Sequence, residues 1–249
     1  KWINIADERR KKYFEKYGVN KILKIIKSDL KIIGIKFDKF TLESEIINKE
    51  FIKFVFNKLK KKNLLYEGQL NKPKSDFNSE WEPRNQLLFR STKFGDDSDR
   101  PFKKSNNDWT YFANDSAYHY NKISRGYYKL FNIWGSDHIG YIKRMQSMVT
   151  VLSDEKIKLN IKVCQLVHLK KDNKPIKMSK RSGNYISIKD VVDEVGSDAL
   201  RFFMLFRKND AQMDFDLKKV LEKNKDNPIF YVQYAYARSS SVLRIANSS

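Results

Sequence analysis

A short basic segment holds the residues whose types and spacing best suit chemistry. Lys177 and Lys180 lie three positions apart, with Met178 and Ser179 between them and Arg181 after them. Cations and a hydroxyl donor in one loop can bind a triphosphate and stabilise the charge that develops on a leaving pyrophosphate. A solvated basic turn without any function has the same composition, so the surrounding sequence has to decide between the two interpretations.

A tyrosine and a carboxylate four positions apart form a second candidate site. Tyr111 and Asp115 stand where an expected strand over 109–112 passes into a helix. A carboxylate can accept two parallel hydrogen bonds from a guanidinium, and an ammonium group cannot reproduce that geometry. The pair would therefore suit a ligand that carries a guanidinium. The alternatives are a core tyrosine and a helix that Asn114 or Asp115 caps.

The turn at 135–138 is a third candidate, because it follows an expected buried strand over 130–134. Sheet enzymes expose ligand-binding groups at the carboxyl ends of parallel strands. His138 is the side chain that we expect to face a ligand there, and a histidine that caps the following helix is the alternative. Asp137 could equally interact with the dipole of that helix.

The elements that must position these residues alternate between strand and helix through the middle of the chain. Helical spacing of apolar residues predicts helices over 22–30, 45–61, 139–152, 190–195, 198–207 and from 227 onward. Alternation predicts strands over 33–37 and 157–169, an apolar run predicts a buried strand over 130–134, and short strands are expected over 87–89 and 109–112. Repeated strand and helix favour an α/β fold with a parallel sheet. Pro73 and polar residues interrupt the segment around 64–108, which indicates an insertion. The apolar run over 198–207 predicts deep burial.

The overall charge of the chain is strongly positive. Its 249 residues include 50 Lys and Arg against 30 Asp and Glu, a net charge of +20. Such a surplus attracts polyanions, so nucleic acid is the leading partner class, although compositional drift toward lysine could produce much of the charge. We expect a cytoplasmic protein with no membrane partner, because no apolar run could span a bilayer and no secretion signal opens the chain. The single cysteine, Cys164, excludes an internal disulfide, and the three histidines lack metal-ligand spacing, so no protein-bound metal is predicted.

The sequence around the basic segment resembles a known family. Residues 177–184 read Lys-Met-Ser-Lys-Arg-Ser-Gly-Asn, which is similar to the signature loop of class I aminoacyl-tRNA synthetases, with Arg181 in place of the commoner serine. The arginyl-tRNA synthetase family in particular is similar over 89–104, 109–134, 190–207, 214–216 and 226–235. The resemblance covers at least 63–249.

This resemblance implies a fold and a domain order. It implies an α/β chain with part of the class I nucleotide-binding, Rossmann-like parallel sheet, followed by the start of an all-α domain. Residues 1–207 would form the second part of the catalytic core, with the inserted segment around 64–108 and the signature loop at 177–181. Residues 208–249 would form a linker and the beginning of the helical anticodon-binding domain.

The resemblance also implies ligands and residue roles. The ligands would be L-arginine, ATP with Mg²⁺ and tRNA(Arg), and the protein would be a monomer. The implied sites are ATP binding by Lys177, Met178, Ser179, Lys180 and Arg181, with Lys177 and Lys180 catalytic, arginine binding by Tyr111, Asp115 and His138, and tRNA binding by Tyr231, Tyr234 and Arg238.

One departure from the family pattern bears on activity. Class I synthetases carry a His-x-Gly-His signature, and the nearest approach here, His138-Ile139-Gly140, follows a different strand and lacks the second histidine. We therefore expect an internal fragment that is inactive alone. The alternatives are a non-catalytic RNA-binding protein that uses the aromatic helix at 230–236, or a class I synthetase for another amino acid. A buried Asp115 without a cation argues against an apolar substrate.

Overall fold

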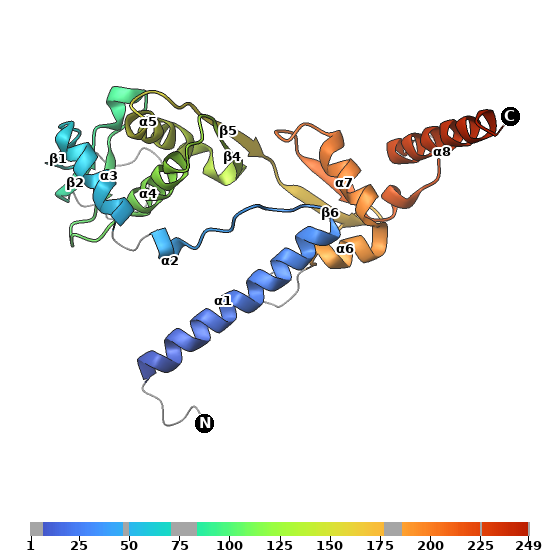
Figure 1. Cartoon of the computed structure of the whole chain (residues 1–249), viewed down its shortest axis with the longest axis horizontal. Helices are drawn as coiled ribbons and strands as arrows, with labels where there is room; N and C mark the ends of the chain where they lie inside the picture. The colour runs from blue at the N-terminus through green and yellow to red at the C-terminus, as the bar shows by residue number, and fades with distance from the viewer. Residues whose placement is uncertain (1–6, 47–49, 71–83, 177–185, 225, 249) are drawn as a thin grey trace. The chain divides into compact units, whose positions relative to one another are not determined.

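The chain folds into two compact units, seen here in a computed structural model that describes residues 7–46, 50–70, 84–176, 186–224 and 226–248. One unit takes residues 39–164, and the other combines 1–38 with 165–249 (Figure 1). The predicted basic segment at 177–181 lies outside the described residues. The predicted domain boundary between 207 and 208 stays a prediction.

An antiparallel sheet and a parallel strand pair form the strands of the 39–164 unit. The antiparallel sheet has the order β1 (Leu65–Gly68), β2 (Gln86–Phe89) and β3 (Arg100–Lys103). The parallel pair joins β4 (Leu130–Gly135) to β5 (Leu159–Cys164), and its register runs from Leu130 opposite Leu159 to Gly135 opposite Cys164. The parallel pair with its intervening helix confirms the predicted α/β class.

Helices pack around one apolar core in the same unit. They are α2 (Glu43–Ile46), α3 (Glu50–Lys61), the 3₁₀ turn η1 (Ser91–Phe94), α4 (Tyr111–Ser124), the 3₁₀ turn η2 (Ser136–Tyr141) and α5 (Ile142–Leu152). Figure 1 shows α3, α4 and α5 beside one another, and each contacts the other two. Val55, Phe102 and Met148 are fully buried in the core. Burying side chains of this size stabilises a fold by about 1.5–3 kcal/mol each relative to exposure.

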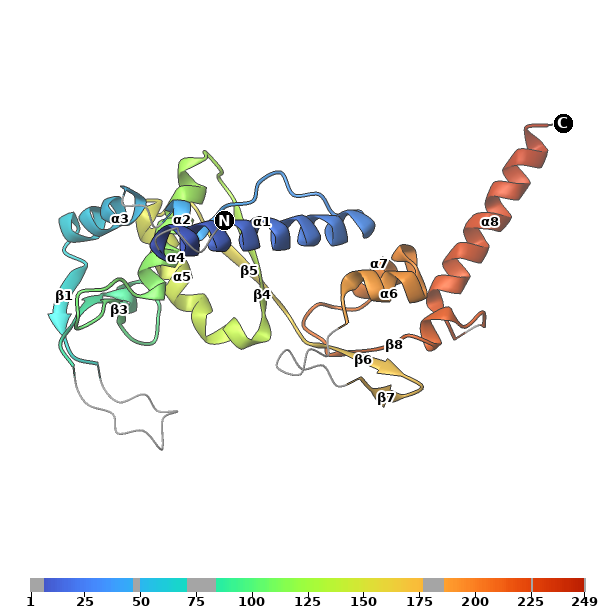
Figure 2. The same cartoon turned by 90° about the horizontal axis from the view of Figure 1, so that it is seen from below.

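The other unit has a three-stranded sheet with β6 at its centre. β6 (Val167–Lys171) pairs antiparallel with β7 (Lys174–Pro175) and parallel with β8 (Met213–Asp216), and Figure 2 shows the three strands side by side. The helices of this unit are α1 (Asp7–Ile32), α6 (Ile188–Val195), α7 (Ser197–Phe206), the 3₁₀ turn η3 (Lys219–Leu221) and α8 (Pro228–Ala246). Asn227 caps α8 by accepting a hydrogen bond from the Ile229 N–H, and Pro228 occupies the first turn, as expected.

Four expectations about elements were wrong. No strand forms over 33–37, where the chain leaves α1 through a left-handed Gly34. Residues 109–112 are not a strand, because Thr110 caps α4 and the helix begins at the next residue. The apolar stretch 157–169 contains two strands that belong to different sheets, not one long strand or strand pair. Finally, α7 buries only Ala199 and Leu200, so its apolar run does not lie deep in a core of the described residues.

Asp216, the last residue of β8, links β8 to the β6–β7 hairpin by a hydrogen bond. One carboxylate oxygen accepts the Asn173 backbone N–H at 2.7 Å, and the other accepts those of Lys218 at 3.0 Å and Lys219 at 3.3 Å. Asn173 lies at a hairpin turn with φ of 59°. The bond from Asn173 is the main reason why the pKa of Asp216 is lowered. Asp216 therefore stabilises the unit above the ordinary pKa of an aspartate and ceases to do so as pH falls through its lower folded value.

Replacing Asp216 with Asn is expected to lower the free energy of unfolding by about 1–3 kcal/mol. The amide has only one oxygen, so its NH₂ group must face the N–H of Asn173 or of Lys218. Urea unfolding followed by circular dichroism measures the loss. Asp214→Asn is the control on the same strand, because Asp214 makes an exposed ion pair with Lys170, which contributes little. Equal destabilisation by the two variants would contradict this assignment.

Candidate active site

Tyr111 and Asp115 lie on one face of α4, as their spacing predicts. The Thr110 side chain caps the helix by accepting the Ala113 N–H at 3.2 Å, and it donates to the Pro101 carbonyl oxygen at 2.8 Å. The cap ties the start of α4 to β3 and thereby fixes where the pair lies. Tyr111 is 81% exposed, so it is not the core tyrosine of the alternative reading.

Asp115 is a partly buried carboxylate that lacks an ion pair. Among the residues that the structure describes, no Lys or Arg lies within ion-pair distance of it. Burial is the main reason why the pKa of Asp115 is raised. Glu43 raises the pKa further, while Tyr141, His138 and Lys122 lower it. Burial destabilises the ionised carboxylate more than the neighbouring groups stabilise it, so the site favours a cationic ligand.

Tyr141, at the end of η2, faces Asp115 from the other side. Its hydroxyl oxygen is buried and completes no hydrogen bond of good geometry with any residue of the described ranges. The hydroxyl still lies close enough to Asp115 for each group to shift the pKa of the other. Burial, reinforced by Asp115, raises the pKa of Tyr141, so its hydroxyl is neutral and able to donate.

His138 lies on the same turn, three residues before Tyr141. Its side chain is 60% exposed, its ring lies 6.1 Å from that of Trp134, and its Nε2 lies 3.5 Å from a carboxylate oxygen of Asp137. The charge of His138 also acts on Asp115, whose pKa it lowers slightly. The structure thus brings Asp115, His138 and Tyr141 together, and Tyr111 stands one helical turn before Asp115.

Beneath this group runs a buried polar chain that links α4 to β4. His119 Nδ1 contacts the Asp115 carbonyl oxygen at 2.8 Å, and Asn132 Nδ2 donates to His119 Nε2 at 2.8 Å. Lys122 Nζ then donates to Asn132 Oδ1 at 3.0 Å. His119 and Asn132 are 4% and 5% exposed. Because Nε2 accepts, the proton is on Nδ1 and the ring is neutral.

No role was predicted from the sequence for His119, Asn132 or Tyr141. The available signals were the four-residue spacing from Asp115 to His119 and the place of Asn132 at an inward position of a buried strand. Burial, with a smaller effect of Lys122, lowers the pKa of His119 to about 4. The polar chain of His119, Asn132 and Lys122 therefore holds α4 against β4, and its histidine stays uncharged at neutral pH.

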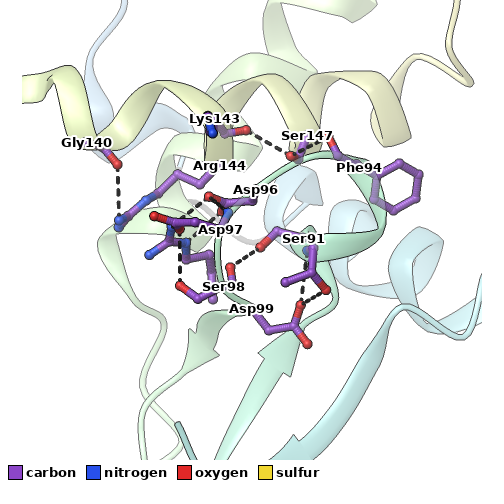
Figure 3. Close-up of polar contacts among 12 residues, drawn as sticks. Ser91, Phe94, Asp96, Asp97, Ser98, Asp99, Gly140, Lys143, Arg144 and Ser147 are labelled. Atoms are coloured by element: carbon purple, nitrogen blue, oxygen red, sulfur yellow. Dashed lines mark hydrogen bonds and ion pairs between the residues drawn. The ribbon is translucent and has the colours of Figure 1, made fainter. Parts of the chain in front are cut away.

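A second polar cluster supports η2 and the start of α5 (Figure 3). Arg100 donates from Nε and Nη2 to the two carboxylate oxygens of the buried Asp96, each at 2.7 Å. Ser147 on α5 donates to the Phe94 carbonyl oxygen at 3.1 Å, which joins α5 to the end of η1. The Arg144 guanidinium donates to the Gly140 carbonyl oxygen at 3.3 Å. Asp96 is therefore committed to a bidentate arginine pair.

The predicted tRNA-contacting residues share one face of α8. Tyr231, Tyr234 and Arg238 follow one another at spacings of three and four, and all three are exposed. The predicted ATP-binding residues Lys177, Met178, Ser179, Lys180 and Arg181 lie outside the described residues. The described chain approaches them through Ile176, whose N–H donates to the Leu169 carbonyl oxygen at 2.9 Å.

The described residues contain no group of three His, Cys, Asp or Glu side chains placed to hold a metal ion. Within the same ranges, no helix is both long and apolar enough to cross a bilayer. Cys164 is partly buried at the end of β5.

Comparisons with known proteins point to one group of enzymes. The family described as tRNA synthetases class I (I, L, M and V) matches residues 109–217. Arginine–tRNA ligase of Ruegeria pomeroyi is 51% identical over 230 residues, and that of Pelagibacter ubique is 53% identical over 230 residues. Each match covers 92% of this chain and 40% of the relative, so the chain spans about two fifths of the length of these relatives.

Solved structures agree in fold. A structure described as an arginyl-tRNA synthetase of Campylobacter jejuni superposes with a TM-score of 0.79 at 33% identity, covering 97% of this chain and 49% of that one. Arginyl-tRNA synthetase of Thermus thermophilus gives a TM-score of 0.74 at 16% identity, covering 96% of this chain and 47% of that one. The second likeness concerns fold alone. Together they confirm the fold that the sequence predicted.

Replacing His119 with Gln tests the buried polar chain. Glutamine oxygen can still accept from Asn132, but the side chain does not titrate. With a folded pKa of about 4, the native protein binds fewer protons than the unfolded chain between that value and the ordinary pKa of histidine. Its stability should therefore fall by about 2 kcal/mol between pH 7 and pH 4.5 from His119 alone. Urea unfolding at the two pH values should show this loss in the unchanged protein and not in the variant, and equal losses would contradict the assignment.

Proposed function

We propose that this chain, which belongs by sequence and fold to the class I arginyl-tRNA synthetases, forms part of the active site of a longer arginine–tRNA ligase. The observation that carries the proposal is the partly buried Asp115 carboxylate, which has no ion pair among the described residues, in a chain about half identical to arginine–tRNA ligases. A guanidinium bound to Asp115 would replace the hydration that the carboxylate has lost.

Arginine would be recognised from α4 and η2. Asp115 would accept hydrogen bonds from the guanidinium, and Tyr111 would lie against the ligand from the preceding helical turn. His138 would approach the ligand from η2. The exposure of Tyr111 and His138 leaves both side chains available to a ligand. A carboxylate held in place on a helix favours a planar fork of N–H donors over the compact ammonium of lysine.

Two transfers would follow at the bound arginine. Its carboxylate attacks the α-phosphorus of ATP, the bond to the bridging oxygen breaks, and pyrophosphate leaves as arginyl-adenylate forms. A terminal ribose hydroxyl of tRNA(Arg) then attacks the arginyl carbonyl carbon, loses its proton, and displaces AMP. Lys177 and Lys180 would neutralise the departing pyrophosphate, and Mg²⁺ would enter with ATP as part of the substrate.

The tRNA would be bound through charge and stacking. The net charge of +20 attracts the phosphate backbone, and the exposed Tyr231 and Tyr234 offer ring faces to unpaired bases, with Arg238 one turn further along α8. The ligase would act as a monomer in the cytoplasm.

Replacing Asp115 with Asn in the full-length ligase is expected to raise the KM for arginine about 100-fold, because the amide has no charge and only one acceptor for the guanidinium. The KM for ATP should stay within about twofold, since the change leaves the triphosphate site alone. Aminoacylation of tRNA(Arg) at varied arginine and ATP measures both. Asp210→Asn removes the same charge from an exposed turn and is the matched control. An arginine KM that does not move would rule out Asp115 as the guanidinium ligand.

Replacing Lys180 with Ala should give the opposite pattern. Loss of one charge-stabilising donor typically lowers the rate of the chemical step about 100-fold or more, so arginine-dependent pyrophosphate exchange with tRNA present should fall by that factor. The KM for arginine should stay within about threefold, because Lys180 is assigned to the phosphates. Lys174→Ala, an exposed lysine on β7, is the control. Unchanged exchange would remove Lys180 from the mechanism.

A further inference from the structure

We propose that Tyr141 is a further specificity-determining residue, whose hydroxyl donates to one Asp115 oxygen and accepts an N–H of the guanidinium that binds there. The inference rests on the proposed function, because it names a second protein group for the same substrate. Neither the sequence pattern nor the relatives assign a role to this tyrosine.

The unsatisfied hydroxyl is the first observation behind the proposal. Buried polar groups almost always have a hydrogen-bond partner, and a buried group without one calls for an explanation. The Tyr141 hydroxyl is buried next to the Asp115 carboxylate, close enough for each group to shift the pKa of the other, but without a hydrogen bond of good geometry within the part of the chain that the structure describes. A small movement on ligand binding would satisfy both groups.

The second observation is that the ring of Tyr141 is held on several sides. Phe112 lies edge-on at 6.4 Å between ring centroids, and Trp134 lies edge-on at 6.0 Å. The guanidinium of Arg144 lies 4.7 Å from the ring centroid, at cation–π distance. These contacts keep the hydroxyl from turning away to solvent, so it is positioned before the ligand arrives.

The third observation is that Arg144 does not compete for the Asp115 carboxylate. Arg144 donates to the Gly140 carbonyl oxygen, and its electrostatic partners besides Tyr141 are Asp96, Asp97 and Arg100. The local cation thus acts on the tyrosine ring, and Asp115 keeps its negative charge for a ligand.

This arrangement explains how Asp115 and Tyr141 would select a guanidinium. A planar guanidinium has several N–H donors in one plane, so it can bond the carboxylate and the phenol oxygen at the same time. An ammonium group that reaches Asp115 is a compact point charge and does not match that spacing. Selectivity would come from two fixed acceptors on η2 and α4 in addition to charge attraction.

The test is Tyr141→Phe in the full-length ligase, because phenylalanine keeps the ring contacts and removes only the hydroxyl. We expect the KM for arginine to rise about tenfold, the loss typical of one hydrogen bond to a charged group, with kcat and the KM for ATP changed less than about twofold. Tyr128→Phe, which removes a hydroxyl from a tyrosine that is 78% exposed, is the matched control.

A pH profile provides a readout that a general loss of stability would not produce. Tyr141 lowers the pKa of Asp115, so its removal should move the acidic limb of kcat/KM for arginine to higher pH. Glu43, His138 and Lys122 also act on Asp115 and are unchanged in the variant. An arginine KM within twofold of the unchanged enzyme, or an unmoved acidic limb, would overturn the role of Tyr141. If the unchanged full-length protein does not charge tRNA with arginine at all, the proposed function itself fails.

Discussion

The burial of Asp115 without an ion pair is the constraint on which the 39–164 unit depends. A carboxylate loses hydration when it is covered, and nothing beside Asp115 returns that loss in full. Such a group persists only where its helix cannot move to expose it. The Thr110 cap fixes the start of α4, and the His119–Asn132 contact fixes its next turns against β4. The polar chain of His119 and Asn132 is therefore part of what keeps Asp115 in place.

The sequence predicted the elements with strong periodicity and missed those decided by tertiary contacts. Strand β4 was found from its apolar run, and α8 from Pro228 after a capping residue. The start of α4 was missed because the aromatic residues Trp109, Tyr111 and Phe112 favour a strand, whereas Thr110 bonds across to β3 and opens a helix. The exposure of α7 could not be read from composition, since an apolar run gives no information on which neighbours cover it.

The residues of the candidate site likewise divide into those that the sequence predicted and those that it did not. Tyr111, Asp115 and His138 could be named because their spacing and the family pattern singled them out, and the structure places them near one another. Tyr141 and Asn132 could not be named, because their importance lies in contacts between residues distant in sequence. One is a hydroxyl that lies against Asp115 without a hydrogen bond of good geometry in the described ranges, and the other is an amide that fixes the tautomer of a histidine.

The residues on either side of 177–185, which holds the segment predicted to bind phosphate, are fixed by hydrogen bonds within the second unit. On one side, Asp216 holds the β6–β7 hairpin through the Asn173 N–H, and Ile176 is bonded to Leu169. On the other side, Ser187 and Asp190 form a capping box that starts α6. Loops that bind phosphate need anchored ends, because each disordered residue at the ends would add to the entropy lost on binding. Both anchors use backbone N–H groups bonded to oxygens, so their strength does not depend on the lysine-rich surface.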